Sequence, residues 1–377
     1  MGQRTAEADG QRQRALALEQ QGSNSEAETA WREYVKAHPS SAEPYAHLGL
    51  LEARQEHFKE AVPLYRKALA LNPAFPGLRL NLGLALFKGG AMKEAVEEFK
   101  PLLKGQPASS PGRQQLTVLL GMAHYALGEF AEAAPYLKQA AANDAGNLGL
   151  RLSLAHSCMW SKQYQCVLDT YREILLLNAE SAEADMLAGE AMDELKDHVG
   201  AIQQFRAAEQ ANPKEPDVHF GLGYLLWTQR QYAEAVGEFQ AELGNNPTHV
   251  QALIYLGDTE MQLSHPEAAR PLFEKALSLD SGREMAYLDL GILDADAGRK
   301  EDALREMKEA ARLAPEDVNV HWRLGRLYQS MGRKDEAKAE LEQAQKITRA
   351  VDNALIEKMS PSHAKPAAGQ AGAAGKP

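Results

Sequence analysis

Cysteine is scarce in this sequence, and long apolar runs are absent from it. The chain has 2 Cys among 377 residues, too few for a disulfide-stapled scaffold and a number that suits a reducing compartment. No stretch approaches the length of a membrane span, and the polar start from Met1 to Arg14 holds no signal-peptide core. These absences predict a chain that does not insert into membranes and that resides in the cytoplasm.

A surplus of positive charge is also missing. The sequence carries 52 acidic and 41 basic residues, a formal net charge of −11 at pH 7. Binding to a phosphate backbone requires a basic face, so this balance argues against a nucleic acid as the main partner. The hydrophobic content of 44% is ordinary for a folded protein and excludes disorder along the whole chain.

The most prominent feature of the sequence is a repeat with a period of 34 residues, whose phase is broken once by the four residues Ser110-Pro111-Gly112-Arg113. Ala follows each first small residue after 12 positions, except that Val167 follows Ala155, and a large apolar residue comes 4 positions later. Pro closes five of the units. The first small residues are Gly49, Gly83, Gly121, Ala155, Gly189, Gly223, Gly257, Gly291 and Gly325.

This order of small, small, large and Pro resembles the tetratricopeptide repeat. The resemblance implies an all-α fold, a right-handed α-solenoid superhelix of stacked antiparallel helix hairpins. Residues 1–7 are expected to be disordered, and residues 352–377 to form a short capping helix and a disordered Ala/Gly/Pro tail. The ten predicted units are 8–41, 42–75, 76–109, 114–147, 148–181, 182–215, 216–249, 250–283, 284–317 and 318–351.

The residue types within a unit suit two helices that cross closely. In unit 42–75, Gly49 and Ala61 are small where the two helices meet, and Tyr65 fills the space beside the crossing. One hairpin cannot bury its apolar face alone, so the neighbouring hairpins supply the core.

Arrangements typical of enzymes are missing from the sequence. Gly221-Leu222-Gly223 lacks the third glycine and the preceding strand of a dinucleotide-binding loop, and no P-loop, His-Glu-x-x-His motif or metal-spaced Cys pair occurs. We therefore predict no enzymatic activity, no cofactor and no metal site. Cys158 and Cys166, on opposite helices of one hairpin, are interpreted as small buried thiols, with a redox switch as the alternative.

In tetratricopeptide proteins the first helices of successive units line a concave groove in which ligands bind. The first helices predicted here carry a mostly apolar stripe of side chains on the side that would face this groove. Ile254 and Leu288 belong to the stripe, together with the groove residues given below. An apolar groove for a peptide, burial against neighbouring helices and a self-association surface remain three open interpretations. The predicted groove residues are Leu84, Phe87, Met122, Tyr125, His156, Glu190, Asp193, Phe220, Tyr224, Trp227 and Asp258.

Charge along the chain indicates which partner fits. Residues 182–317 hold 27 acids and 12 bases, whereas unit 318–351 is basic and includes Arg323 and Arg326. The expected partner is a protein or peptide segment, amphipathic, with apolar anchors and basic flanks. Phe220, Tyr224 and Trp227 form an aromatic triplet in unit 216–249. One partner segment is predicted to reach both this triplet and the acids Glu190 and Asp193 of unit 182–215.

Two binding modes that the family resemblance implies do not fit. A carboxylate clamp needs Lys and Asn where this chain has Ala46, Leu50 and Leu80. An asparagine ladder fails after Asn81, because the same offset then holds Leu119, Ser153, Leu187 and Gly221.

The sequence thus favours a non-enzymatic scaffold or adaptor that binds proteins or peptides in its groove. Two alternatives are a regulatory sensor that changes superhelical pitch when it binds a peptide, and an accessory subunit of an envelope or glycan assembly complex.

Overall fold

The computed structural model describes residues 2–177 and 180–359. These residues form twenty α-helices and no strand. The predicted tail Ser360–Pro377 lies outside the described residues. Within the described part, no helix combines the length and the apolarity needed to cross a bilayer. The chain divides into an N-terminal unit, Met1–Glu215, and a C-terminal unit, Pro216–Pro377.

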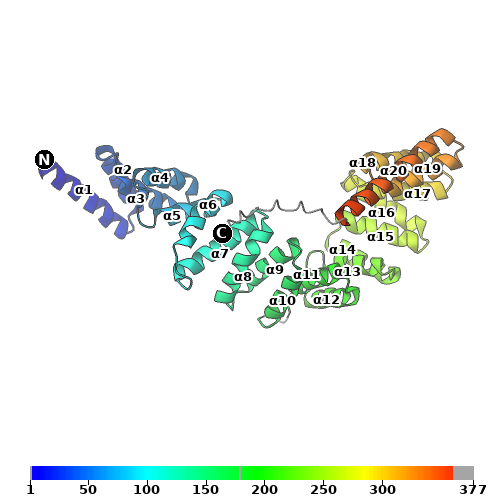
Figure 1. Ribbon diagram of the computed structural model, residues 1–377, viewed down its shortest axis with the longest axis horizontal. Helices are drawn as coiled ribbons and strands as arrows, with labels where there is room; N and C mark the ends of the chain where they lie inside the picture. Colours follow the sequence, from blue (N-terminus) through cyan, green and yellow to red (C-terminus); the bar gives the residue numbers. More distant parts are fainter. Residues whose placement is uncertain (1, 178–179, 360–377) are drawn as a thin grey trace, which may run out of the picture. The chain divides into compact units, whose positions relative to one another are not determined.

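Both units consist of helical hairpins in which each odd-numbered helix packs against the next even-numbered one (Figure 1). The helices of the N-terminal unit are α1 (Gly2–Gln20), α2 (Asn24–Ala37), α3 (Ala42–Arg54), α4 (Phe58–Leu71), α5 (Leu78–Lys88), α6 (Met92–Lys104), α7 (Pro111–Ala126), α8 (Phe130–Asn143), α9 (Leu148–Trp160), α10 (Tyr164–Leu175), α11 (Ala182–Glu194) and α12 (His198–Ala211). Those of the C-terminal unit are α13 (Val218–Thr228), α14 (Tyr232–Asn245), α15 (Val250–Gln262), α16 (Pro266–Leu279), α17 (Glu284–Asp296), α18 (Lys300–Leu313), α19 (Val318–Ser330) and α20 (Lys334–Met359).

The two ends of the array differ from the sequence expectation. Helix α1 begins at Gly2, so helix extends into residues 1–7, which were expected to be disordered. Helix α20 runs without a break from Lys334 to Met359, so the expected capping helix is the end of the last repeat helix.

The predicted close crossing of the two helices is confirmed. A Cβ added to Gly223 would lie 2.8 Å from Cε1 of Phe239, and one added to Gly257 would lie 2.6 Å from Cε1 of Phe273. Both rings are fully buried. Glycine is required at these positions because a large ring of the second helix occupies the space beside its backbone.

A left-handed residue ends the first helix of each hairpin. Arg230 has φ of 59° and Gly298 has φ of 76° at equivalent positions, 68 residues apart. The next amide reaches back into the helix: the N–H of Gln231 donates to the carbonyl of Leu226 at 2.9 Å. This Schellman-type bond satisfies carbonyls that the helix end leaves open and turns the chain into the second helix.

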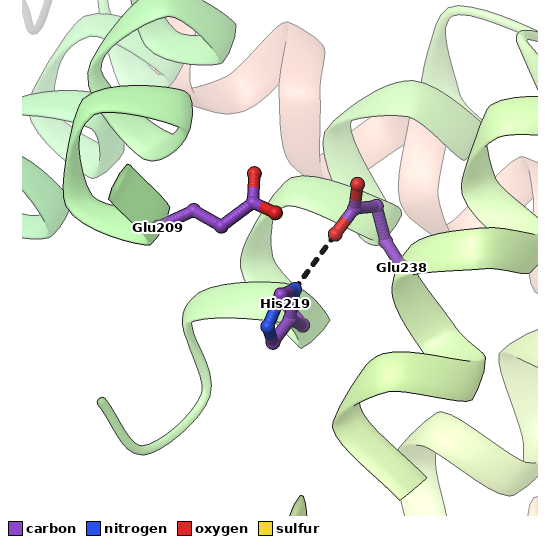
Figure 2. Close-up of side chains that lie close together, drawn as sticks. All are labelled: Glu209, His219 and Glu238. Atoms are coloured by element: carbon purple, nitrogen blue, oxygen red, sulfur yellow. Dashed lines mark hydrogen bonds and ion pairs between the residues drawn. The ribbon is translucent and has the colours of Figure 1, made fainter. Parts of the chain in front are cut away.

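Buried histidines tie the two helices of some hairpins together. The Nδ1 atom of His219 lies 2.8 Å from Oε2 of Glu238 (Figure 2), and Nδ1 of His321 lies 2.6 Å from Oε2 of Glu340. Glu209, also drawn in Figure 2, belongs to the N-terminal unit. Both histidines are buried, and the carboxylate partner explains how a polar ring is accommodated there.

The interpretation of the cysteines as free buried thiols is wrong. Cys158 in the last turn of α9 and Cys166 in the first turn of α10 form a disulfide, with their Cα atoms 5.8 Å apart. The short turn between the helices brings these two positions face to face, which the amino-acid composition could not indicate. The bond lies in unit 148–181, which has Ala155 and Val167 at the two close-crossing positions where unit 42–75 has Gly49 and Ala61.

Two matched glycine substitutions test the crossing. Gly223→Ala should lower the free energy of unfolding by about 1–3 kcal/mol, because its Cβ collides with the ring of Phe239. Gly237→Ala, on the exposed side of α14, should raise it by up to about 1 kcal/mol, because a Cβ there meets no atom within 4 Å. Urea denaturation measures both, and effects of the same sign would contradict the crossing.

Hydrogen exchange locates the damage from Gly223→Ala. Protection should fall first in α13–α16, because each hairpin contacts only its neighbours. The hairpin of Gly49 should keep its protection, and a uniform loss would contradict the nearest-neighbour arrangement.

Reduction of the disulfide should weaken the α9–α10 hairpin. Opening a bond between residues 8 apart is expected to cost about 2 kcal/mol of unfolding free energy. Denaturation with and without a phosphine reductant measures the loss, and a Cys158→Ala/Cys166→Ala double variant should not respond to the reductant. Two thiols that react with an alkylating agent in the denatured, unreduced chain would show that the bond is absent.

Candidate functional site

The aromatic triplet predicted for the groove lies on α13. Phe220, Tyr224 and Trp227 are spaced i, i+4, i+7, so they share one side of the helix. All three are half-buried, whereas the neighbouring Leu222 and Leu226 are buried in the core. The triplet therefore belongs to the surface of the hairpin and is covered in part by the next one.

Tyr255 of α15 provides that cover. Its ring centroid lies 5.4 Å from that of Tyr224 and 5.2 Å from that of Trp227, edge-on in both cases. Phe220 also meets it at 5.9 Å. Edge-to-face contacts of this kind stabilise an aromatic cluster beyond its buried area. Tyr255 was not predicted as a groove residue from the sequence. It stands 34 residues after Gly221 and holds the same repeat position that Asn81 holds in its unit.

Asp258, one turn further along α15, holds the indole of the triplet. The Nε1–H of Trp227 donates to Oδ2 of Asp258 at 2.6 Å. This bond fixes the ring and keeps a carboxylate beside the aromatic cluster. Burial raises the pKa of the Tyr255 hydroxyl, and the nearby Tyr224 and Asp258 raise it further.

Asp289 of α17 adds a second carboxylate, and it is buried. Only 8% of the residue is exposed, and its Oδ2 atom has no hydrogen-bond partner among the described residues. Burial raises the pKa of Asp289 to about 7, and the charge of Asp258 acts in the same direction. Arg323 of α19 opposes the shift, but its own buried Nε atom also lacks a hydrogen-bond partner within residues 2–177 and 180–359.

These side chains, on adjacent odd-numbered helices, form one continuous surface. We refer to it as the first-helix surface of the C-terminal unit. It comprises the half-buried Phe220, Tyr224, Trp227, Tyr255, Asp258, Ile292 and Arg323, and the buried Asp289 adjoins it. Ile254 and Leu288, which the sequence assigned to the same stripe, are instead buried at 4% and 6% exposure and belong to the core.

The predicted apolar groove residues of the N-terminal unit are also half-buried. Leu84 and Phe87 pack against the buried core around Phe99. Met122 and Tyr125 pack against the core around Leu137. Their role in binding stays a prediction.

The predicted polar groove residues of the N-terminal unit have different surroundings. His156 lies with Nε2 2.8 Å from Oε1 of Glu183. Asp193 is paired with Nδ1 of His198 at 2.7 Å, and Glu190 is exposed. Because Glu190 and Asp193 belong to one unit and the aromatic triplet to the other, a single segment that reaches both remains a prediction.

One cluster of the C-terminal unit has the donor atoms of a metal site. Asp217, Glu242 and His249 bring their ligand atoms within 4.8 Å of one another. However, Nδ1 of His249 accepts the amide N–H of Ala252, so the ring proton is on Nε2, which donates to Oδ1 of Asp217 at 2.9 Å. These contacts cap α15, and a metal at Nε2 would have to displace the proton that makes one of them.

The basic end of the C-terminal unit contains a cavity of about 410 Å³. Arg323, Arg326 and Lys300 line it, with Ile292 and Leu327 as apolar neighbours. The guanidinium of Arg326 lies 4.8 Å from the ring centroid of Trp322, a cation–π contact that orients it. This cavity is the alternative binding position if the aromatic triplet proves to be core.

Comparisons with known proteins identify the repeat. Profiles described as "Tetratricopeptide repeat" match more than half of the chain. The matched residues are 12–74, 47–110, 97–147, 168–216, 220–284 and 295–355.

Individual relatives are distant. "BBSome complex member BBS4" of Bos taurus is 24% identical over 334 residues, which cover 85% of this chain and 63% of that protein. "Protein O-mannosyl-transferase TMTC1" of Homo sapiens is 25% identical over 234 residues, which cover 61% of this chain and 26% of that protein. The chain thus spans less than two thirds of either relative. A solved tetratricopeptide repeat protein from Parabacteroides merdae ATCC 43184 is 20% identical, with a TM-score of 0.49, over 71% of this chain and 97% of that one.

The buried Asp289 makes stability depend on pH. Its pKa rises on folding from 3.8 to about 7, so the folded chain holds a proton that the unfolded chain releases, and stability falls as pH increases through this window. Between pH 5 and pH 8 the free energy of unfolding should drop by about 2–3 kcal/mol relative to Asp289→Asn. Urea denaturation across this range measures the difference.

An exposed acid on the same helix provides the control for this pH dependence. Asp296→Asn should leave the slope of stability against pH as in the unchanged chain, because Asp296 is exposed. If the Asp289→Asn curve runs parallel to the unchanged one, the carboxyl of Asp289 is not buried in the way described.

Proposed function

Since the chain belongs to the tetratricopeptide repeat family, we propose that it is a non-enzymatic scaffold that binds a protein or peptide segment on its first-helix surfaces. The observation that carries this proposal is the aromatic cluster of the C-terminal unit. Phe220, Tyr224, Trp227 and Tyr255 are only half-buried and continuous across two hairpins. Large aromatic side chains in such positions dominate the binding energy of protein interfaces.

The charges beside the cluster support a basic partner. Asp258 lies against Trp227, and Asp289 is close enough to Asp258 for its pKa to respond to that charge. A segment with apolar anchors and flanking Lys or Arg residues complements this combination, and opposite charges across an interface favour the right partner and speed association. The acidic surplus of residues 182–317 acts in the same direction.

A role as a subunit of a larger complex is the second candidate. The bovine relative is named as a member of a complex, and it matches 85% of this chain. The human transferase matches over only 26% of its own length, so that likeness gives no support for an enzymatic role of this chain. A cytoplasmic location loses the support of the cysteines, because disulfides persist mainly in oxidising compartments.

A peptide library displayed on phage and selected on the immobilised chain tests the binding role. The selected peptides should contain two or more large apolar residues flanked by Lys or Arg. Enrichment of acidic peptides, or of none, would contradict the proposed partner chemistry.

Substitution of Trp227 tests the position of the site. Trp227→Ala should weaken the selected peptides by about 2 kcal/mol or more, as truncation of a central aromatic residue does. Trp160→Ala is the matched control, because Trp160 is 69% exposed and lies in the other unit. Calorimetric titration measures affinity, and thermal unfolding checks that the hairpin stays folded. If Trp227→Ala unfolds its hairpin while peptides still bind, the triplet is core and the site lies around Arg323 and Arg326.

A further inference from the structure

Asp289 differs from the buried Asp185 and Asp294, which accept hydrogen bonds from Tyr171 and Arg299. The side chain of Asp289 is nine-tenths buried on α17, and no donor of the described residues reaches Oδ2. An unpaired carboxylate oxygen in such a place costs stability, because the group has given up water and gained no replacement. Asp289 therefore lowers the stability of the folded chain.

The internal cation that acts on Asp289 does not satisfy it. Arg323 on α19 is close enough to lower the pKa of Asp289, yet its Nε atom is also buried and unpartnered. On the other side, Asp258 repels Asp289 while it holds the indole of Trp227. Two carboxylates thus lie near each other without a cation hydrogen-bonded to either in the described part of the chain.

Aromatic rings stand beside Asp258, one of the two acids. Trp227 contacts Asp258 directly, and Tyr255 precedes Asp258 by one turn of α15 and packs edge-on against Trp227. Carboxylates bind ammonium and guanidinium groups through charge-assisted hydrogen bonds. The faces of Trp and Tyr attract the same groups through cation–π contact.

We propose that Asp258 and Asp289, beside the rings of Trp227 and Tyr255, form a binding site for an organic cation, supplied by a Lys or Arg side chain of the bound peptide. This inference rests on the proposed peptide-binding function and adds to it the group that recognises the basic flank. The cation supplies the hydrogen bonds that Asp289 lacks and removes the repulsion between the two carboxylates.

Binding of a cation at this site is coupled to release of the proton on the carboxyl group of Asp289. The charged groups that act on Asp289 are Asp258 from α15 and Arg323 from α19; none from α16 or α18 does so in the described residues. A bound cation favours the ionised carboxyl, so binding releases the proton that the empty site retains near neutral pH. Affinity for a cation should therefore increase about tenfold between pH 6 and pH 8.

The indole N–H of Trp227 is a built-in reporter for this site. In a two-dimensional proton–nitrogen spectrum of the labelled full chain, its signal is assigned by its loss in Trp227→Phe. Titration with n-butylguanidinium chloride at pH 8 should shift it, with a dissociation constant on the order of millimolar. At pH 6 the affinity should be about tenfold lower. N-butylurea, the neutral analogue of the same shape, should leave the signal in place.

Variants separate the proposal from its alternatives. Asp289→Asn should weaken n-butylguanidinium at least fivefold at pH 8 and abolish the pH dependence, whereas Asp296→Asn on the same helix should do neither. Arg323→Met should tighten binding, because it removes the competing internal cation. Equal shifts with N-butylurea, or undiminished binding by Asp289→Asn, would overturn the proposal. Loss of binding in Arg323→Met would also overturn it and would identify Arg323 as the structural partner of Asp289.

The same variants distinguish this proposal from the wider binding function. If selected peptides bind to Asp289→Asn as to the unchanged chain and still depend on Trp227, the cation site is wrong and the peptide surface stands. If no peptide binds and n-butylguanidinium still shifts the indole signal in an Asp289-dependent way, the cation site stands and the peptide function fails.

Discussion

The typical hairpin of this protein depends on two helices that come close together beneath one large side chain. At Gly223 and Gly257 the backbone of the first helix lies so near the rings of Phe239 and Phe273 that a single methyl group has no room. Full burial of each ring is worth about 1.5–3 kcal/mol, and the next hairpin covers the apolar face that remains. Because this contact fixes the register of the stack, residues 34 apart occupy equivalent positions, and side chains gather in rows along the first helices.

The unit that contains Ala155 shows how the same fold accommodates a crossing without its usual glycine and alanine. With Ala155 and Val167 at the crossing, its large residue, Tyr171, is only half-buried. The Tyr171 hydroxyl donates to Oδ1 of Asp185 at 2.7 Å, and burial raises its pKa. The disulfide of Cys158 joins the helices of this same hairpin. Hydrogen bonding and a covalent link thus accompany a crossing that lacks its glycine.

The candidate site lies where the side chains at one repeat position differ from hairpin to hairpin while the backbone repeats. The row that contains Gly221 continues as Tyr255, Asp289 and Arg323, each on the next first helix. Tyr255 packs edge-on against Tyr224 of the aromatic triplet, and the Oδ2 atom of Asp289 is buried without a hydrogen-bond partner among the described residues. A rigid repeat can present such a series to an extended ligand without any change of fold, because only side chains vary from hairpin to hairpin. The aromatic and acidic character of the row is what favours a partner with apolar anchors and basic flanks.

The sequence alone determined the helical class, the 34-residue phase, the glycine crossings and the side of α13 that carries Phe220, Tyr224 and Trp227. Periodicity shows which residues share one face of a helix, since the spacing of side chains within a helix is fixed. It does not show how deeply the next hairpin covers that face. Only the tertiary structure decided that Tyr255 covers the triplet in part and that Oδ2 of Asp289 is buried with no hydrogen-bond partner in the described part of the chain. It also decided that Cys158 is bonded to Cys166. These features depend on distances between separate helices, which are set by the side chains packed between them, and no pattern within one helix contains that information.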